Sequence, residues 1–147
     1  MIEVVEVTDE RGAVAAGDWL RKAEAVHRQL RPDMPPEYAA KMERVFAGGG
    51  RMCVAVEGAK VAGVAVYRVY ENTWAGRQLY VDDLVTDEPA RSQGVGRTLL
   101  GYLERKARSL GLANLCLDSG THRQQAHKFY FREGMVVTSF HFAKKLA

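Results

Sequence analysis

Cysteine, proline and long hydrophobic runs are all scarce in this sequence. Its 147 residues include two cysteines and four prolines. Two cysteines cannot form the disulfide framework of a small secreted domain, and Cys53 and Cys116 both lie in apolar, strand-like runs. They predict buried, unbridged thiols in a reducing compartment, and therefore a cytoplasmic protein. No stretch approaches the ~18 consecutive apolar residues of a membrane span, and the alternating, acid-containing residues 1–7 are unlike a signal peptide.

Charge of a single sign is also absent. Lys and Arg number 21 and Asp and Glu 18, which gives a formal net charge of +3, and the two signs are interleaved. Because no dense basic run is present, we expect neither nucleic acid nor a membrane as a partner. A small anionic cofactor is compatible with this balance. The chain is long enough for one domain, residues 1–147, with a full core.

The periodicity of apolar residues indicates a mixed α/β fold. The expected strands are 2–7, 52–56, 61–70, 79–86, 115–118 and 136–142. The expected helices are 17–30, 37–47, 95–110 and about 124–133. Glycines 48–50 end the second helix, and we interpret them as a stop and a flexible turn.

The most informative feature is the turn Arg91-Ser92-Gln93-Gly94-Val95-Gly96, between the strand 79–86 and the helix 95–110. A helix that begins at such a turn presents unbonded backbone N–H groups with the positive end of its dipole behind them, which suits a phosphate. Gly94 and Gly96 have no Cβ to block a pyrophosphate, and Arg91 adds charge at the rim. The turn therefore predicts an anion site.

Two well-known phosphate loops do not fit this turn. A P-loop needs Lys-Ser or Lys-Thr after the glycines, and neither pair is present. A dinucleotide fold needs a third glycine where this chain has Leu99. The turn resembles instead the acyl-CoA loop of the GNAT acetyltransferase superfamily, Arg/Gln-x-x-Gly-x-Gly/Ala. A second segment, Ala126 to Met135, resembles that family's Ala-x-x-Phe/Leu-Tyr-x-x-x-Gly-Phe motif, with Met135 in place of the usual Phe.

The resemblance implies a GNAT-like α/β fold and an activity. The implied fold is a mixed, mostly antiparallel sheet of about six to seven strands, flanked by about four helices, with a splayed central strand pair that holds acyl-CoA. The implied reaction is direct transfer of an acetyl group from acetyl-CoA to a primary amine of a small molecule or peptide, in a ternary complex. The cofactor would be held by Leu84, Val85, Thr86, Arg91, Ser92, Gln93, Gly94, Val95, Gly96, Arg97 and Arg123.

The resemblance also implies catalytic residues. Tyr130 matches the family tyrosine that protonates the departing thiolate. Asp118 follows the short strand and is a candidate for the group that deprotonates the amine, or else caps the turn that follows it. Asp82 and Asp83 are rivals on the strand 79–86, and because side chains alternate along a strand, we expect only one of them to face the cleft.

Arg123 departs from the family pattern, and the neighbouring His122 is also considered for a role. The family often has an asparagine seven residues before the tyrosine, where this chain has Arg123. That arginine contacts the cofactor differently, reaches an acidic acceptor, or is a solvated residue at the helix start. His122 is a further candidate base. We expect no metal site, because His122 and His127 are five residues apart and lack a His-Glu-x-x-His frame.

Alternatives to an acetyltransferase remain. A non-catalytic acyl-CoA-binding sensor or interaction module would keep the phosphate loop and lose the acid–base residues. An unrelated α/β domain would need two family motifs to arise by chance. The sequence does not identify the acceptor amine. The edge of the expected C-terminal strand suggests a homodimer.

Overall fold

The computed structural model describes residues 1–147 and divides into two compact units, 1–116 and 117–147, each of which is described by itself. The helices are α1 (Gly17–Leu30), α2 (Tyr38–Ala47), α3 (Val95–Ser109) and α4 (Gln124–Arg132). The strands are β1 (Glu3–Glu6), β2 (Arg51–Glu57), β3 (Lys60–Asn72), β4 (Gly76–Thr86) and β5 (Asn114–Leu117). A short 3-10 helix, Glu88–Ala90, follows β4.

The strands form one five-stranded sheet in the order β1-β2-β3-β4-β5. The pairs β1–β2, β2–β3 and β3–β4 are antiparallel. The Ala113 N–H donates to the Arg77 carbonyl (2.9 Å), and Cys116 Sγ lies 3.8 Å from the Leu79 carbonyl, so β5 runs in the same direction as β4. The sheet is therefore mixed and mostly antiparallel, as expected, but it has five strands and not six to seven.

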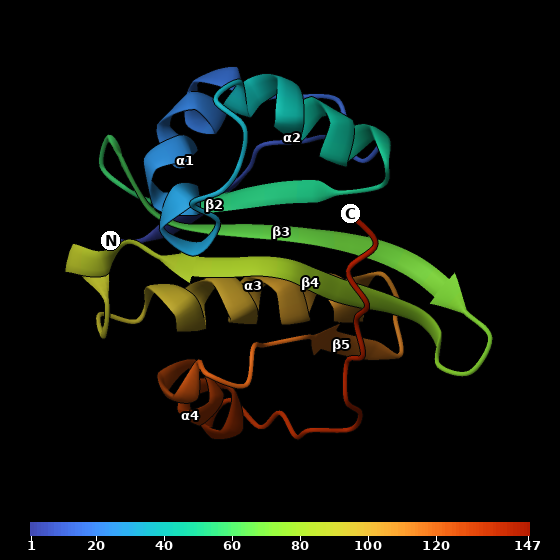
Figure 1. Cartoon of the computed structure of the whole chain (residues 1–147). Helices are drawn as coiled ribbons and strands as arrows, with labels where there is room; N and C mark the ends of the chain where they lie inside the picture. The colour runs from blue at the N-terminus through green and yellow to red at the C-terminus, as the bar shows by residue number, and fades with distance from the viewer. The chain divides into compact units, whose positions relative to one another are not determined.

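The two faces of the sheet are covered by different helices, α1 and α2 on one side and α3 on the other (Figure 1). Helix α1 buries Leu20, Ala23 and Val26 at helical spacing against β3 and β4. Helix α2 adds Met42 and Phe46 to the same core. The apolar stripes that predicted these helices are thus the surfaces that pack on the sheet.

A polar cluster lies between the sheet and α3. The Glu6 carboxylate accepts hydrogen bonds from the hydroxyls of Tyr67 (2.9 Å) and Tyr102 (2.7 Å), and from Lys106 Nζ (3.0 Å). Burial, followed by the charge of Glu6, raises the pKa of Cys53 beside it. Neither cysteine forms a disulfide, and while Cys53 is buried as expected, Cys116 is only partly buried. This cluster holds α3 on the sheet through four polar side chains that satisfy one another.

The C-terminal segment differs from the expectation. Residues 136–142 form no strand, and the side chains of Val136, Val137, Phe140 and Phe142 are 68–92% exposed. A run of β-branched and aromatic residues becomes a strand only where a neighbouring edge pairs with it. The C-terminal strand edge through which a dimer was expected to pair is therefore absent. The helices of the chain are all too short or too polar to cross a membrane.

Candidate active site

The glycine-bearing turn leads directly into α3, as the sequence predicts. Gly94 is the N-cap residue of α3, with φ of +85°, and no side chain caps this helix. The N–H groups in the first turn of any helix have no partner within that helix. At α3 no capping side chain supplies an acceptor for them either. Residues 91–94 are exposed, and the first turn contains no acidic residue. The helix start is thus open to an anion.

Local backbone geometry explains why glycine is needed here. The left-handed conformation at Gly94 is one that other residues rarely adopt, and a Cβ placed on Gly94 would meet nothing within 4 Å. Gly63 on β3 has the opposite role: a Cβ there would lie 2.7 Å from Val95 Cγ1 and 2.8 Å from Leu99 Cδ1. Gly63 therefore allows the first turn of α3 to approach the sheet closely.

Strand β4 extends beyond its neighbour β5. Strand β4 has eleven residues and β5 has four, and the bond from Ala113 to Arg77 places β5 beside the beginning of β4. Leu84, Val85 and Thr86 lie past the part of β4 that four residues can cover. They pair on their other side with β3. The backbone that the sequence assigns to the cofactor is therefore at the uncovered end of β4.

A β-bulge changes the direction of the side chains in the middle of β4. Val66 pairs with Asp83 and the next residue, Tyr67, pairs with Val81, so Asp82 has no residue opposite it. The extra residue interrupts the alternation of side chains, and Asp82 and Asp83 line the same cavity. The expectation that only one of these carboxylates faces the cleft is wrong, because it assumed a regular strand.

The cavity has a volume of about 500 Å³ and lies between β3, β4, α1 and α2. This volume is in the range of small-molecule sites. Its apolar wall consists of Leu30, Met34, Met42, Val45 and Val66. Its charged groups are Arg31, Asp33, Lys41, Arg68, Asp82 and Asp83, and His27 also lines it. An apolar wall with a few convergent charges is typical of a small-ligand site.

Asp83 is held by a hydrogen-bonded chain that begins in α2. Burial, and then the charges of Glu24 and Asp83, raise the pKa of Tyr38, so its hydroxyl stays protonated and donates to His27 Nδ1 (2.8 Å). His27 Nε2–H donates to Asp83 Oδ2 (2.7 Å), since a carboxylate can only accept. Arg31 Nε donates to Asp83 Oδ1 (2.8 Å). A neutral imidazole satisfies both of its neighbours.

The two carboxylates differ in how many of their oxygens accept a hydrogen bond from the protein. Burial raises the pKa of Asp83, but the hydrogen bonds from His27 and Arg31 outweigh it and hold that pKa below its usual value. Asp82 accepts a hydrogen bond from Arg68 Nε on Oδ2 (2.8 Å), and its Oδ1 has no partner from the protein. Asp83 is thus a fixed anion, while Asp82 keeps one oxygen available.

The remaining candidates lie in the unit 117–147. Asp118 forms an ion pair with His141 Nδ1 (2.8 Å), in which the two side chains are 47% and 70% exposed. Tyr130 on α4 is partly buried; burial raises its pKa and the positive charge of Arg123 opposes that shift. Arg123 is the N-cap residue of α4. His122 is exposed, and Phe131 on α4 is 58% exposed.

Several cavity residues were not found from the sequence. His27 lies on the apolar stripe of α1, only 1% exposed, and a polar residue in such a stripe signals a buried partner. The partner, Asp83, is 56 residues away, and no local pattern identifies it. Arg31 and Arg68 have no sequence signal beyond their positive charge.

Comparisons with known proteins identify the family and the fold of this chain. The model of the acetyltransferase (GNAT) family matches residues 18–135. The uncharacterized N-acetyltransferase YhdJ of Bacillus subtilis (strain 168) is 43% identical over 70 residues, which are 47% of this chain and 49% of that protein. The aminoalkylphosphonate N-acetyltransferase of Salmonella typhimurium (strain LT2) is 34% identical over 80 residues, 54% of this chain and 50% of that protein. The chain spans about half the length of these curated relatives.

Solved structures share the fold over the whole chain. An aminoglycoside N-acetyltransferase in complex with CoA has a TM-score of 0.82 at 16% identity, over 100% of this chain and 96% of that chain. Glucosamine-6-phosphate N-acetyltransferase from Arabidopsis thaliana has a TM-score of 0.75 at 19% identity, over 100% and 99%. At these identities the likeness concerns the fold. The family match over residues 18–135 covers both motifs, and it shows that the chain belongs to the GNAT family of acetyltransferases.

Proposed function

We propose that the protein is an acetyl-CoA-dependent N-acetyltransferase that acetylates a primary amine of a small molecule. One observation carries the proposal: β4 contributes two carboxylates to a cavity and leads, past its end, to an uncapped, glycine-bearing helix start. A carboxylate suits an ammonium group, and the helix start suits a pyrophosphate. The same strand thus connects a site for the acceptor with a site for the cosubstrate.

The residues of the loop fit the cosubstrate. The exposed turn 91–94, the absence of a side chain capping α3 and the open space at Gly94 would let backbone N–H groups contact a pyrophosphate. Arg91 and Arg97 would add positive charge, and the backbone of residues 84–86 would bind the pantetheine arm. When bound, acetyl-CoA would supply an activated acetyl thioester.

The proposed roles of the side chains balance the protons of the reaction. The ammonium group gives one proton to Asp82, directly or through water, and the amine nitrogen then forms a bond to the acetyl carbon. As the carbon–sulfur bond breaks, the nitrogen loses a second proton, which returns through water to Tyr130 after that residue has protonated the sulfur. Tyr130 donates its hydroxyl proton to the departing sulfur, and its raised pKa keeps that proton in place until the bond breaks. Asp83 stays ionised and orients the groups around Asp82. Asp118, which His141 holds, is the alternative base.

The first experiment is calorimetric titration with acetyl-CoA and with CoA. Micromolar binding supports the loop assignment, and absence of binding at millimolar concentrations would refute it. A panel of amines is then assayed by release of the CoA thiol. Binding without turnover of any amine would favour the acyl-CoA-binding module over the enzyme.

The variant Tyr130→Phe tests the proposed acid. It should lower kcat by about 10²-fold and leave acetyl-CoA affinity unchanged, since only a proton donor is lost. Tyr70→Phe is the matched control, because Tyr70 is partly exposed on β3 and its hydroxyl only accepts a hydrogen bond from Gln78. Equal kcat values for Tyr130→Phe and wild type would exclude Tyr130 as the acid.

The acceptor amine, the oligomeric state and the cellular location are proposed in less detail. The Salmonella relative is named for an aminoalkylphosphonate, and structural neighbours are named for aminoglycosides, so the names do not select one amine class. We propose one catalytic domain over residues 1–147, in the cytoplasm because neither cysteine is bridged. A homodimer would rest on the exposed apolar side chains of residues 136–142, and light scattering at high micromolar concentration tests it.

A further inference from the structure

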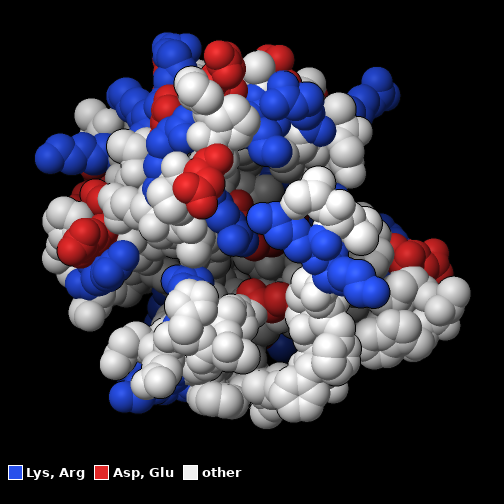
Figure 2. Space-filling model, viewed as in Figure 1, with Lys and Arg blue, Asp and Glu red and all other residues white.

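The cavity beside β4 contains equal numbers of positive and negative side chains. Its cations are Arg31, Lys41 and Arg68, and its carboxylates are Asp33, Asp82 and Asp83. The formal charge of these six groups is therefore zero. Over α1 and α2 as well, basic and acidic side chains are interspersed (Figure 2).

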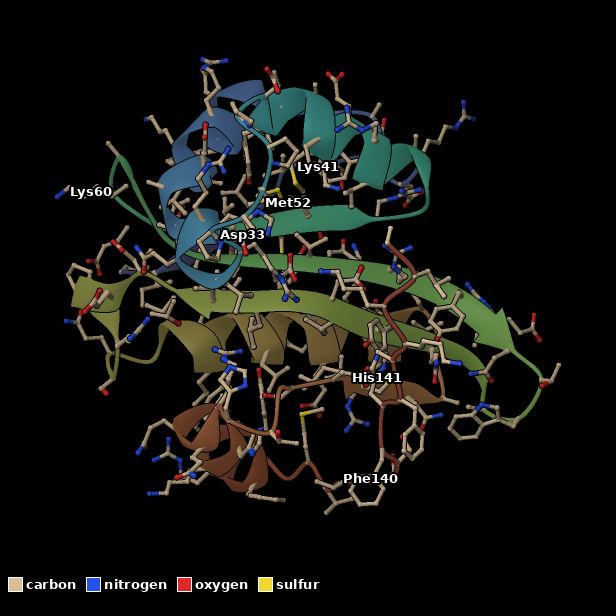
Figure 3. All side chains as sticks on the ribbon, in the orientation of Figure 1. Asp33, Lys41, Met52, Lys60, Phe140 and His141 are labelled. Carbon is tan, nitrogen blue, oxygen red and sulfur yellow. The ribbon has the colours of Figure 1, made fainter.

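Not all of these charges are neutralised by a partner. Asp83 is bound by Arg31, and Asp82 is bound by Arg68 through one oxygen only. The side chain of Lys41, on α2, is partly buried in the cavity wall, and its ammonium group has no hydrogen bond or ion pair (Figure 3). An ammonium group in a cavity wall can donate to an anion through three N–H groups. A bound anion would supply the partner that the protein does not.

The balance of charges distinguishes between classes of amine. An acceptor with several ammonium groups would leave Lys41 without a partner and add positive charge to a cavity whose charges already balance, and like charges at close range are costly. An acceptor with one ammonium and one anionic group leaves the charge of the filled cavity unchanged. Its ammonium can bind the open Asp82 Oδ1, and its anion can bind Lys41.

We propose that the acceptor is a small amine that also carries an anionic group, a carboxylate, phosphate or phosphonate, and that Lys41 binds this group and determines specificity for it. The proposal rests on the proposed function, because it assigns the acceptor side of the same site. Lys41 acts on binding of the acceptor and has no part in proton transfer.

The test compares small primary amines, of which all but the diamine have the same two-carbon spacer. Phosphoethanolamine and β-alanine carry an anion, ethanolamine carries none, and putrescine serves as the diamine. The wild-type kcat/KM for the anionic amines should exceed that for ethanolamine and putrescine by about ten-fold or more, the value of one charge-assisted contact. Lys41→Met should remove this preference by raising KM for the anionic amines and not KM for ethanolamine.

A matched control is Lys60→Met, which removes the same charge from the β2–β3 hairpin, away from α2 (Figure 3). It should leave the preference intact. Equal losses for ethanolamine and the anionic amines in Lys41→Met, or a wild-type preference for putrescine, would overturn the proposal.

A binding measurement separates this proposal from the proposed function. Phosphoethanolamine is titrated calorimetrically into the wild type and Lys41→Met, each saturated with CoA. Binding that weakens about ten-fold in Lys41→Met supports the acceptor class even if no amine turns over, and then only the catalytic proposal fails. Acetylation of neutral amines without measurable binding of phosphoethanolamine would retain the enzyme and refute the acceptor class.

Discussion

Replacing His27 with alanine should destabilise the protein strongly, because His27 joins α1 to both α2 and β4. The side chain is 1% exposed and bonds to the Tyr38 hydroxyl at 2.8 Å and to Asp83 at 2.7 Å. The charge-assisted bond to Asp83 contributes ~1.5–3 kcal/mol. The hydroxyl of Tyr38 would be left buried without a partner, at a cost of ~1–3 kcal/mol. Arg31 still satisfies Asp83, so we expect a total loss of about 3–5 kcal/mol.

Urea unfolding followed by circular dichroism measures this loss, and thermal unfolding should show a midpoint about 10 °C or more below that of the wild type. Tyr38→Phe removes the orphaned hydroxyl, so the double variant should be more stable than the sum of the single losses predicts. His141→Ala, at an exposed ion pair, is the control and should change stability by less than about 0.5 kcal/mol. A loss below about 1 kcal/mol for His27→Ala, or strictly additive losses with Tyr38→Phe, would refute the buried chain of hydrogen bonds.

Three further predictions follow from the structure. Gly94→Glu should lower acetyl-CoA affinity at least ten-fold by repelling the pyrophosphate, whereas Gly58→Glu, also at positive φ, should not. Equal acetyl-CoA affinities of Gly94→Glu and wild type by calorimetry would exclude the loop as the pyrophosphate site. The pKa of Asp83 is held below its unfolded value, so the wild type should have a larger free energy of unfolding than Asp83→Asn above about pH 4, and this difference should shrink as the pH falls further. A difference that grows on acidification, measured by urea unfolding, would contradict this. Burial raises the pKa of Cys53, so a disulfide reagent should modify Cys53 only after unfolding; rapid reaction of native Cys116→Ser protein would show otherwise.

Local sequence patterns predicted most of the secondary structure. Apolar residues at helical spacing predicted a helix over 17–30, and α1 has these bounds. The glycine-bearing turn was placed correctly before α3, because the left-handed residue Gly94 and the amphipathic stripe that follows it are both local features. Such features depend on neighbours within a few residues, which the sequence displays directly.

The C-terminal strand shows where local patterns fail. Residues 136–142 have strand-forming side chains, yet they form no strand. Strand propensity describes a fit to a neighbouring strand, and a sequence does not state whether a free edge is available. The expected strand count was too high for the same reason.

The sequence by itself determined the family, the order of α1 to β5 and the position of the glycine-bearing turn before α3, because motifs and periodicity are properties of short segments. Only the tertiary structure decided which residues line the cavity beside β4. The bulge that turns both Asp82 and Asp83 into one cavity, and the contact of His27 with Asp83 across 56 residues, arise from strand pairing and helix packing. Pairing and packing join residues distant in the chain, so no local pattern contains them.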